Sequence, residues 1–227
     1  MEQINWGLDS NKKRQREYAD QFDDNIPNKK SIADISSIFK PNEMIYVFDK
    51  EIHFTSVINK DSIETMIKKI TEINNTYCEY FNKLPRIQTK SLEITYIVDS
   101  PGGCVTSVLK FVDFIRICKK KYPYIKFTSI ATGLIASAGT IMCIVADRRK
   151  MTKNAQAMIH ELSSGNGGKY TEIMSYSNYL THLHNALTQI YLDRSSKSKT
   201  ELEELLKDET WFTAKEYLKH GFVDEII

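Results

Sequence analysis

Gly133-Leu-Ile-Ala-Ser-Ala-Gly139 joins two apolar segments in the second half of this 227-residue chain. The preceding segment, Lys126-Phe-Thr-Ser-Ile-Ala131, is short and apolar, which is typical of a buried strand, and residues 140–146 continue as an apolar segment that favours a helix. Ser137 is thereby placed near a helix N-terminus, where free backbone N–H groups favour negative charge. Ser137 is a candidate nucleophile, although small residues are also what two closely packed backbones require.

The segments before this stretch alternate between strand and helix patterns. Residues 92–98 form an apolar strand pattern and run directly into Asp99-Ser-Pro-Gly-Gly103. A helix with one apolar face follows and ends at Lys119-Lys-Lys121, as cations favour the end of a helix. This order predicts an α/β fold with a mainly parallel sheet built from β-α-β units, in which chemistry gathers at the carboxyl ends of the strands.

The remaining segments extend this pattern in both directions. Before residue 92 we expect a strand at 44–48, a helix that begins at Asp61 and an insertion loop at 74–90. After residue 146 the polar run 148–150 is assigned no element, and residues 157–160 form a short strand that ends at His160. The last part of the chain suggests a projecting helix of about 25 residues, followed by a shorter helix after Thr200 that reaches residues 208–214. A final helical turn is expected at 215–220 and a closing strand at 221–227.

Composition and charge limit the partners, the location and the kinds of site that are expected for this protein. The formal net charge is +2, from 31 basic and 29 acidic residues, which favours neither a nucleic acid nor an anionic membrane as partner. We expect a soluble cytoplasmic protein, because the chain has no long apolar run and no signal-peptide pattern at its start. The four cysteines form no CxxC pair, so reduced thiols are expected and no metal site. Residues 1–42 are interpreted as a polar arm before a domain at 43–227.

Nucleophilic chemistry requires further groups near Ser137. A serine becomes nucleophilic when a base accepts its proton and a carboxylate orients that base. His160, at the end of a strand expected next to the one that leads to Ser137, is the natural base, and Asp208-Glu209 supplies the carboxylate. The backbone N–H groups of Gly103 and Ala138 are candidate donors for an oxyanion hole.

Four motifs in one order resemble the ClpP serine peptidases, in particular their compact phage and viral forms. They are Ser100-Pro-Gly-Gly103, the heptad Gly133–Gly139, Met158-Ile-His160, and Trp211–Glu216 followed by Gly221-Phe-Val-Asp224. The resemblance covers residues 43–227 and implies the ClpP/crotonase fold, with a handle at about 161–195 where subunits meet. It further implies stacked, usually heptameric rings that enclose the active sites and receive unfolded chains from an ATP-driven unfoldase, without a cofactor.

The resemblance also assigns roles to residues. It implies Ser137 as nucleophile, His160 as base, and Gly103 with Ala138 as oxyanion donors. The third member falls on Glu209, where most members have Asp, and Asp208 stays open as the alternative. The chain departs from the family after His160, where Glu161-Leu162 replaces the usual Gln-Pro, which affects substrate binding more than chemistry.

Three other interpretations remain open at this point. The chain could be a catalytically inactive ring or scaffold subunit that kept the fold. It could be a crotonase-type acyl-CoA enzyme, which shares the fold and the stabilisation of an oxyanion but needs no Ser/His pair at these positions. Cys104, at a helix start beside Gly103, could compete as nucleophile through a lowered pKa, but we interpret it as a buried small residue.

Overall fold

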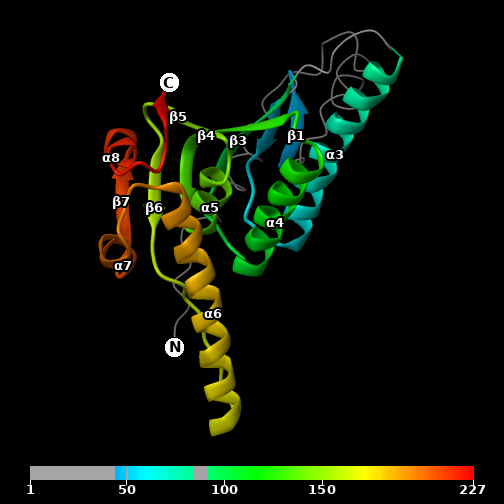
Figure 1. Ribbon diagram of the computed structural model, residues 1–227. Coiled ribbons are helices and arrows are strands. Elements are labelled where there is room, and N and C mark those ends of the chain that lie inside the picture. Colours follow the sequence, from blue (N-terminus) through cyan, green and yellow to red (C-terminus); the bar gives the residue numbers. More distant parts are fainter. Residues whose placement is uncertain (1–43, 50, 84–90) are drawn as a thin grey trace, which may run out of the picture. The chain divides into compact units, whose positions relative to one another are not determined.

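The computed structural model describes residues 44–49, 51–83 and 91–227, and Met44–Ile227 form one compact unit. The polar arm predicted for residues 1–42 lies outside the described residues, so the domain division stays a prediction. The described part folds as a mostly parallel sheet with helices packed on it, which confirms the predicted α/β class (Figure 1). The helices in chain order are α3 (Lys60–Asn82), α4 (Val105–Lys121), α5 (Ala138–Ile144), α6 (Tyr170–Arg194), α7 (Lys199–Leu206) and α8 (Ala214–Lys219).

Eight strands of the described residues form one sheet, in which most neighbours run parallel. The main path runs β1-β2-β3-β4-β5-β8, while β6 pairs with β4 and β7 pairs with β6. Only the β1–β2 and β6–β7 pairs within this part of the chain are antiparallel. The strands are β1 (Ile45–Phe48), β2 (Glu51–Phe54), β3 (Leu92–Ser100), β4 (Ile125–Ala136), β5 (Arg148–Met151), β6 (Gln156–Ile159), β7 (Thr210–Thr213) and β8 (Glu225–Ile226).

Strand β4 is long enough to pair with two strands, one after the other, along the same edge. Its segment 128–131 pairs with β5, and its segment 134–136 pairs with β6. The change of partner falls at Gly133, where φ is +52°, and the N–H of Leu134 there donates to Asp99 Oδ1 at 3.1 Å. Beside this position the register between β3 and β4 shifts. The bend at Gly133 therefore places the carboxyl end of β4, and Ser137 after it, next to β6.

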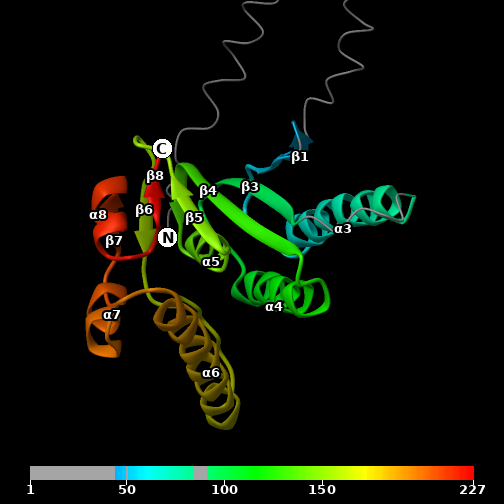
Figure 2. The same ribbon diagram turned by 45° about the horizontal axis from the view of Figure 1, so that its top comes forward.

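Helices α4 and α5 pack on one face of the sheet, below β3, β4 and β5 in the view of Figure 2. The predicted apolar face of α4 is buried, and every residue of α5 is buried. Tertiary burial fixes this short helix, because seven residues are too few for a helix to be stable alone. The buried residues of α4 include Val108, Phe111, Val112, Ile115 and Cys118.

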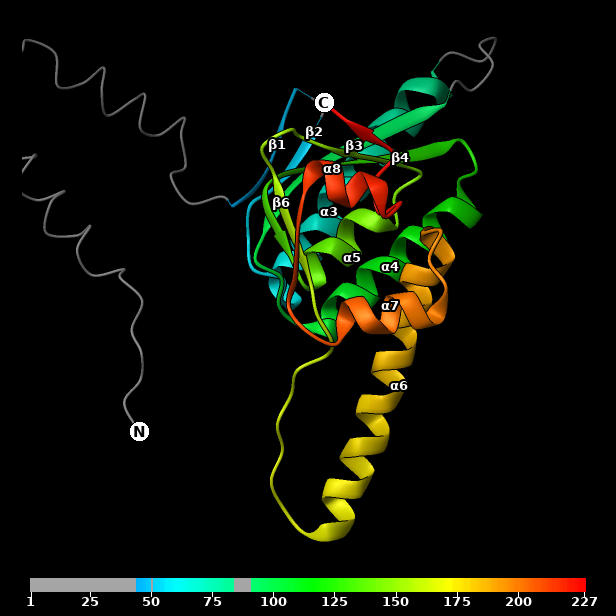
Figure 3. The same ribbon diagram turned by 90° about the vertical axis from the view of Figure 1, so that its left-hand side faces the viewer.

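Helix α6 extends away from the sheet, and the chain that follows β6 runs to the far tip of this helix (Figure 3). It has 25 residues, as the sequence pattern predicted, and its buried residues are Thr188, Ile190 and Tyr191, all in its C-terminal part. Its N-terminal part leaves a set of large apolar side chains exposed. They are Tyr170, Ile173, Met174 and Tyr179.

The structure corrects several element assignments. Residues 74–82, expected in a loop, continue α3, so the loop prediction holds for none of them, and residues 84–90 lie outside the described ones. The polar run at 148–150 lies in β5, and β2 was not expected at all. The helix predicted to reach 208–214 ends at Leu206 and is followed by β7. The closing strand is shorter than predicted, since only Glu225–Ile226 pair in the sheet.

Among the described helices, none combines the length and the apolar character that crossing a bilayer requires.

Candidate active site

Ser137 lies at the sharp connection between β4 and α5. Its backbone has φ +53° and ψ −123°, an unusual conformation for a residue with a side chain. The backbone N–H of Ser137 donates to the carbonyl of Met158 on β6 at 2.8 Å, and the N–H of Thr140 donates to the Ser137 carbonyl at 3.0 Å. Strain of this kind persists only where neighbouring structure holds it, and it is common at functional positions.

His160 directly follows β6, which runs parallel to the end of β4. Its Nε2 lies 2.8 Å from Ser137 Oγ, within hydrogen-bonding distance. The sequence prediction that these two side chains come from neighbouring strands is confirmed by the pairing of Ala136 with Met158. The arrangement allows the imidazole to accept the hydroxyl proton.

Two backbone N–H groups lie at the same end of the sheet. Ala138 is the first residue of α5, so its N–H has no acceptor within the helix. Gly103 forms a parallel bridge with Ile58, and the bridge uses the carbonyl of Gly102 and the N–H of Cys104. The N–H of Gly103 therefore points to the other side of its strand, away from Ile58.

Gly102 and Gly103 have conformations and surroundings that require glycine. Gly102 has φ +92°, and a Cβ there would lie 2.6 Å from the carbonyl oxygen of Ala136 and 2.8 Å from Ser137 Cβ. Gly103 has φ +142°, and a Cβ there would lie 2.2 Å from the carbonyl oxygen of Ile58. This turn is held by the buried hydroxyl of Ser100, which donates to the Ser56 carbonyl at 2.7 Å and accepts from the Gly102 N–H at 3.2 Å. The turn can therefore approach Ser137 closely.

These groups share one cleft of about 380 Å³. Gly103, Ser137, Ala138 and His160 line it together with apolar side chains from α5, α6 and the end of α7. An apolar cleft with a few convergent polar groups is the usual form of a ligand site. The apolar members are Val105, Ile141, Met158, Leu162, Leu187 and Leu206.

The two candidate carboxylates are less closely associated with His160. Glu209 and Asp208 are both exposed, and within the described residues neither makes a hydrogen bond or ion pair with the imidazole. The strand register distinguishes them, however, because Ile159 pairs with Thr210 in the antiparallel β6–β7 pair. One further step of that register sets Glu209 opposite His160, where paired residues project on the same face.

A polar pair beside Ser137 was missed at the sequence level. Thr140 Oγ1 donates to the Ser137 carbonyl at 2.6 Å and also contacts the hydroxyl of Tyr191 on α6. Both side chains are buried. Thr140 lies three residues after Ser137, but Tyr191 is 51 residues further along, so only its helical spacing with Leu187 indicated which face it occupies.

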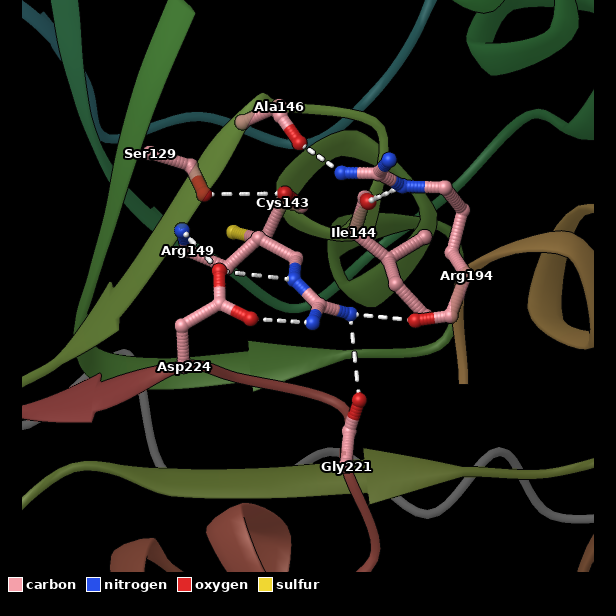
Figure 4. A network of polar contacts seen from close by, with 8 residues as sticks. All are labelled: Ser129, Cys143, Ile144, Ala146, Arg149, Arg194, Gly221 and Asp224. Carbon is pink, nitrogen blue, oxygen red and sulfur yellow. Dashed lines mark hydrogen bonds and ion pairs between the residues drawn. The ribbon is translucent and has the colours of Figure 1, made fainter. Parts of the chain in front are cut away.

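The opposite end of α5 is fixed by polar contacts from several elements (Figure 4). Arg194 Nε donates to the carbonyl of Ile144 at 3.0 Å, and its guanidinium also reaches the carbonyl of Ala146. Arg149 in turn contacts the carbonyl of Arg194 and the carboxylate of Asp224. A cation at a helix C-terminus is favoured by the unpaired carbonyls there. The helix that begins after Ser137 is thereby held at both ends.

The interpretation of Cys104 as a buried residue is wrong. It is the N-cap residue of α4 and is exposed. Hydrogen bonds involving Ser107 and Thr106 lower the pKa of the Cys104 thiol to about 7. The four cysteines are free thiols in the structure, and no cluster of potential metal ligands occurs among the described residues.

Comparison with known proteins agrees with this geometry. A sequence model of the Clp protease family matches residues 50–227. "ATP-dependent Clp protease proteolytic subunit 1" of Protochlamydia amoebophila is 31% identical over 138 residues, which cover 59% of this chain and 65% of that protein. "ATP-dependent Clp protease proteolytic subunit" of Streptococcus gordonii is 31% identical and that of Streptococcus sanguinis is 30% identical; each match of 144 residues covers 62% of this chain and 71% of the relative. Because the family match spans most of the described domain, the chain belongs to the Clp protease family.

Proposed function

We propose that this chain is a serine-type endopeptidase that hydrolyses peptide bonds through an acyl-enzyme. The observation that carries the proposal is the 2.8 Å distance between Ser137 Oγ and His160 Nε2 in a cleft that also exposes the strained Ser137 turn. Membership of the Clp protease family agrees with this activity. The residue roles below rest on this geometry and on the motifs that the chain shares with the family.

The first half of the reaction forms the acyl-enzyme. His160 Nε2 accepts the proton of Ser137 as Oγ attacks the peptide carbonyl carbon. The carbonyl oxygen becomes an oxyanion, which accepts hydrogen bonds from the N–H groups of Gly103 and Ala138. The C–N bond then breaks, and the leaving amine takes the proton from His160. The acyl group remains on Ser137 as an ester.

The second half releases the product. A water molecule gives a proton to His160 Nε2 and attacks the ester carbonyl, and the same two N–H groups stabilise the second oxyanion. The C–O bond to Ser137 breaks, and Oγ recovers its proton from His160. No cofactor enters either half.

Glu209 is proposed as the carboxylate that orients His160. The β6–β7 register favours it over Asp208, since one step beyond the Ile159–Thr210 pair sets Glu209 opposite His160, whereas Asp208 lies one residue further away in a bend. Glu209 is exposed and makes no hydrogen bond with His160 in the described chain, so the segment after α7 would have to move to bring its carboxylate to Nδ1. Asp208 remains the alternative that mutation must exclude.

The exposed apolar side chains of α6 support assembly of several copies. Tyr170, Ile173 and Met174 are 76%, 44% and 46% exposed, and apolar surface of this kind is usually covered by a partner. We propose a homo-oligomer of stacked rings, heptameric by analogy with the family, that cleaves unfolded proteins or peptides in the cytoplasm of the producing or host cell. An ATP-dependent unfoldase would deliver these substrates, although the arm before residue 43 does not resemble the segment that family members place at the ring axis.

Labelling with a fluorophosphonate probe tests the central assignment. The wild-type protein should form a covalent adduct and hydrolyse a fluorogenic peptide, whereas Ser137→Ala should do neither. Cys104→Ser is the matched control, because it removes the other exposed nucleophile near the cleft and should be labelled like the wild type. Equal labelling of the wild type and Ser137→Ala, or an assembled wild-type protein without peptidase activity, would contradict the proposal.

A further inference from the structure

A chain of two buried hydroxyl groups connects α6 to the turn at Ser137. Tyr191, on the last part of α6, is 4% exposed, and Thr140, on the first turn of α5, is fully buried. Their hydroxyl oxygens lie 2.5 Å apart, and Thr140 Oγ1 lies 2.6 Å from the carbonyl oxygen of Ser137. The three groups therefore form a continuous hydrogen-bonded chain beside the cleft.

The direction of this chain follows from the number of protons available. A carbonyl oxygen only accepts, so the single hydroxyl proton of Thr140 is used on the Ser137 carbonyl. Thr140 Oγ1 must then accept from its other neighbour, which makes Tyr191 the donor. The hydroxyl of Tyr217 is also buried and interacts electrostatically with Thr140, but its geometry gives no hydrogen bond with the described residues, whereas the Tyr191 hydroxyl lies 2.5 Å from Thr140 Oγ1. Tyr191 is thus the group that holds the Thr140 hydroxyl in its donating orientation.

The carbonyl at the end of the chain belongs to the peptide unit that carries the N–H of Ala138. The described chain has no cis peptide bond, so in this planar unit the Ser137 carbonyl and the Ala138 N–H point in opposite directions. A hydrogen bond that fixes the carbonyl on the buried side therefore fixes the N–H on the cleft side. Polarisation along the chain also strengthens that N–H as a donor.

This peptide unit needs such an anchor because it is strained. Ser137 has φ +53° and ψ −123°, and rotation of the unit that follows it would move ψ toward the less strained left-handed region while turning the Ala138 N–H away from the cleft. Within the described residues, the carbonyl of Ser137 accepts from the Thr140 N–H at 3.0 Å and from Thr140 Oγ1. Of these two, only the hydroxyl bond depends on α6.

We propose that Tyr191, through Thr140, is a positioning residue that orients the oxyanion-binding N–H of Ala138. This inference rests on the proposed peptidase function, because that function gives the Ala138 N–H its role. The Tyr191 ring lines the cleft, but its hydroxyl is directed at the buried Thr140. A change that removes only this hydroxyl therefore acts on stabilisation of the transition state more than on substrate binding.

Tyr191→Phe is the first test, measured in the assembled protein with a fluorogenic peptide and with a peptide aldehyde of the same sequence. We expect kcat to fall about tenfold with KM nearly unchanged, since only the orientation of one oxyanion donor is weakened. The affinity for the aldehyde, whose hemiacetal oxygen occupies the oxyanion hole, should fall by a similar factor. Tyr176→Phe on the same helix, whose hydroxyl contacts Ser164, is the matched control and should leave both values unchanged.

A double variant separates positioning from stability. Thr140→Val with Tyr191→Phe replaces both partners by apolar groups of similar shape, which is far less destabilising than Thr140→Val alone, because the single change leaves the Tyr191 hydroxyl unpaired. We expect its Tm to recover toward the wild-type value while kcat stays low, because the Ser137 carbonyl has lost its second donor. Thr140→Ser, which keeps the hydroxyl, should retain most of the activity and provides the variant that folds if the others do not.

The outcomes distinguish this inference from the proposed function. Wild-type kcat and aldehyde affinity in Tyr191→Phe would overturn the inference, as would activity in the double variant that recovers together with Tm. Both results require an active wild-type protein that is labelled at Ser137. If the wild type itself is neither labelled nor active, the proposed function has failed, and the inference fails with it.

Discussion

The backbone N–H of Ser137 donates a hydrogen bond of 2.8 Å to the carbonyl of Met158, two residues before His160. This bond ties the end of β4 to β6 at the point where the two side chains meet. Its effect is to set the Ser137 backbone relative to the strand that carries the imidazole, which leaves Oγ and Nε2 2.8 Å apart. The alignment of this pair is therefore a property of the sheet and not of flexible side chains alone.

Gly102→Ala should damage both stability and activity. Alanine at φ +92° is strained, and its Cβ would meet the carbonyl oxygen of Ala136 and the Cβ of Ser137 at less than 3 Å. We expect a loss of unfolding free energy of more than about 1 kcal/mol and a lower kcat in the molecules that remain folded, because the turn must move away from Ser137. Urea unfolding and active-site titration with a fluorophosphonate measure the two effects.

Gly221→Ala is the control for this prediction. Gly221 also has a positive φ, +76°, but its Cβ would contact Ser196, outside the cleft. It should lower the unfolding free energy while each folded molecule keeps its wild-type kcat. Equal loss of kcat in the two variants would show that strain alone, and not the approach of the turn to Ser137, causes the effect.

The sequence predicted that Ser137, His160, Gly103 and Ala138 lie close together, because each lies in a short motif with its own local pattern near the end of an expected strand. The structure brings these four residues into one cleft. It does not bring either carboxylate to His160. The position of Glu209 depends on the short strand β7, whose four residues were expected to be helical. Thr, Trp and Phe favour strands, so the four residues of β7 carried a local strand signal that the helix prediction did not use.

Polar residues caused the other errors because their partners lie far along the chain. Asn74 interrupts the apolar pattern of α3 and suggested a loop, but it is buried and accepts a hydrogen bond of 3.0 Å from the hydroxyl of Tyr124. The polar run of β5 was assigned no element, but Arg149 is held by Asp224, 75 residues away. Such pairs cannot be read from periodicity, since one partner alone looks like a surface residue.

Glu209→Gln should lower activity far more than Asp208→Asn. If Glu209 orients His160, the neutral amide favours the wrong tautomer of the imidazole, and we expect kcat to fall by about 10²- to 10⁴-fold. Asp208→Asn is the matched control, because Asp208 lies one residue further from the β6–β7 pair and should change kcat by less than about threefold. Both residues are exposed, so neither change should lower Tm. The reverse order of effects in steady-state kinetics would transfer the role to Asp208.

Cys104 should be the most reactive thiol of the four without being required for activity. Its pKa is lowered to about 7 by hydrogen bonds involving Ser107 and Thr106, whereas burial raises the pKa of Cys143 to about 12. At pH 7 about half of the Cys104 thiol is therefore thiolate, and its alkylation rate should rise from pH 6 and level off above pH 8. Mass spectrometry after brief iodoacetamide treatment identifies the site. Cys104→Ser should retain the peptidase activity, and loss of that activity would restore Cys104 as a candidate nucleophile.

Asp224 should make folding sensitive to acid. Partial burial raises its pKa, but hydrogen bonds from the Arg149 side chain and backbone N–H more than offset this, so the pKa lies below its ordinary value. Because the pKa of Asp224 is lower in the folded state, its ionised carboxylate stabilises the fold above about pH 4, the ordinary pKa of aspartate in an unfolded chain. This stabilisation is lost as the pH falls below that value. Asp224→Asn should therefore be less stable than the wild type at pH 7 and lose less stability between pH 4.5 and 2.5, as measured by urea unfolding. Parallel pH dependence of the unfolding free energy for the wild type and Asp224→Asn would refute the assignment.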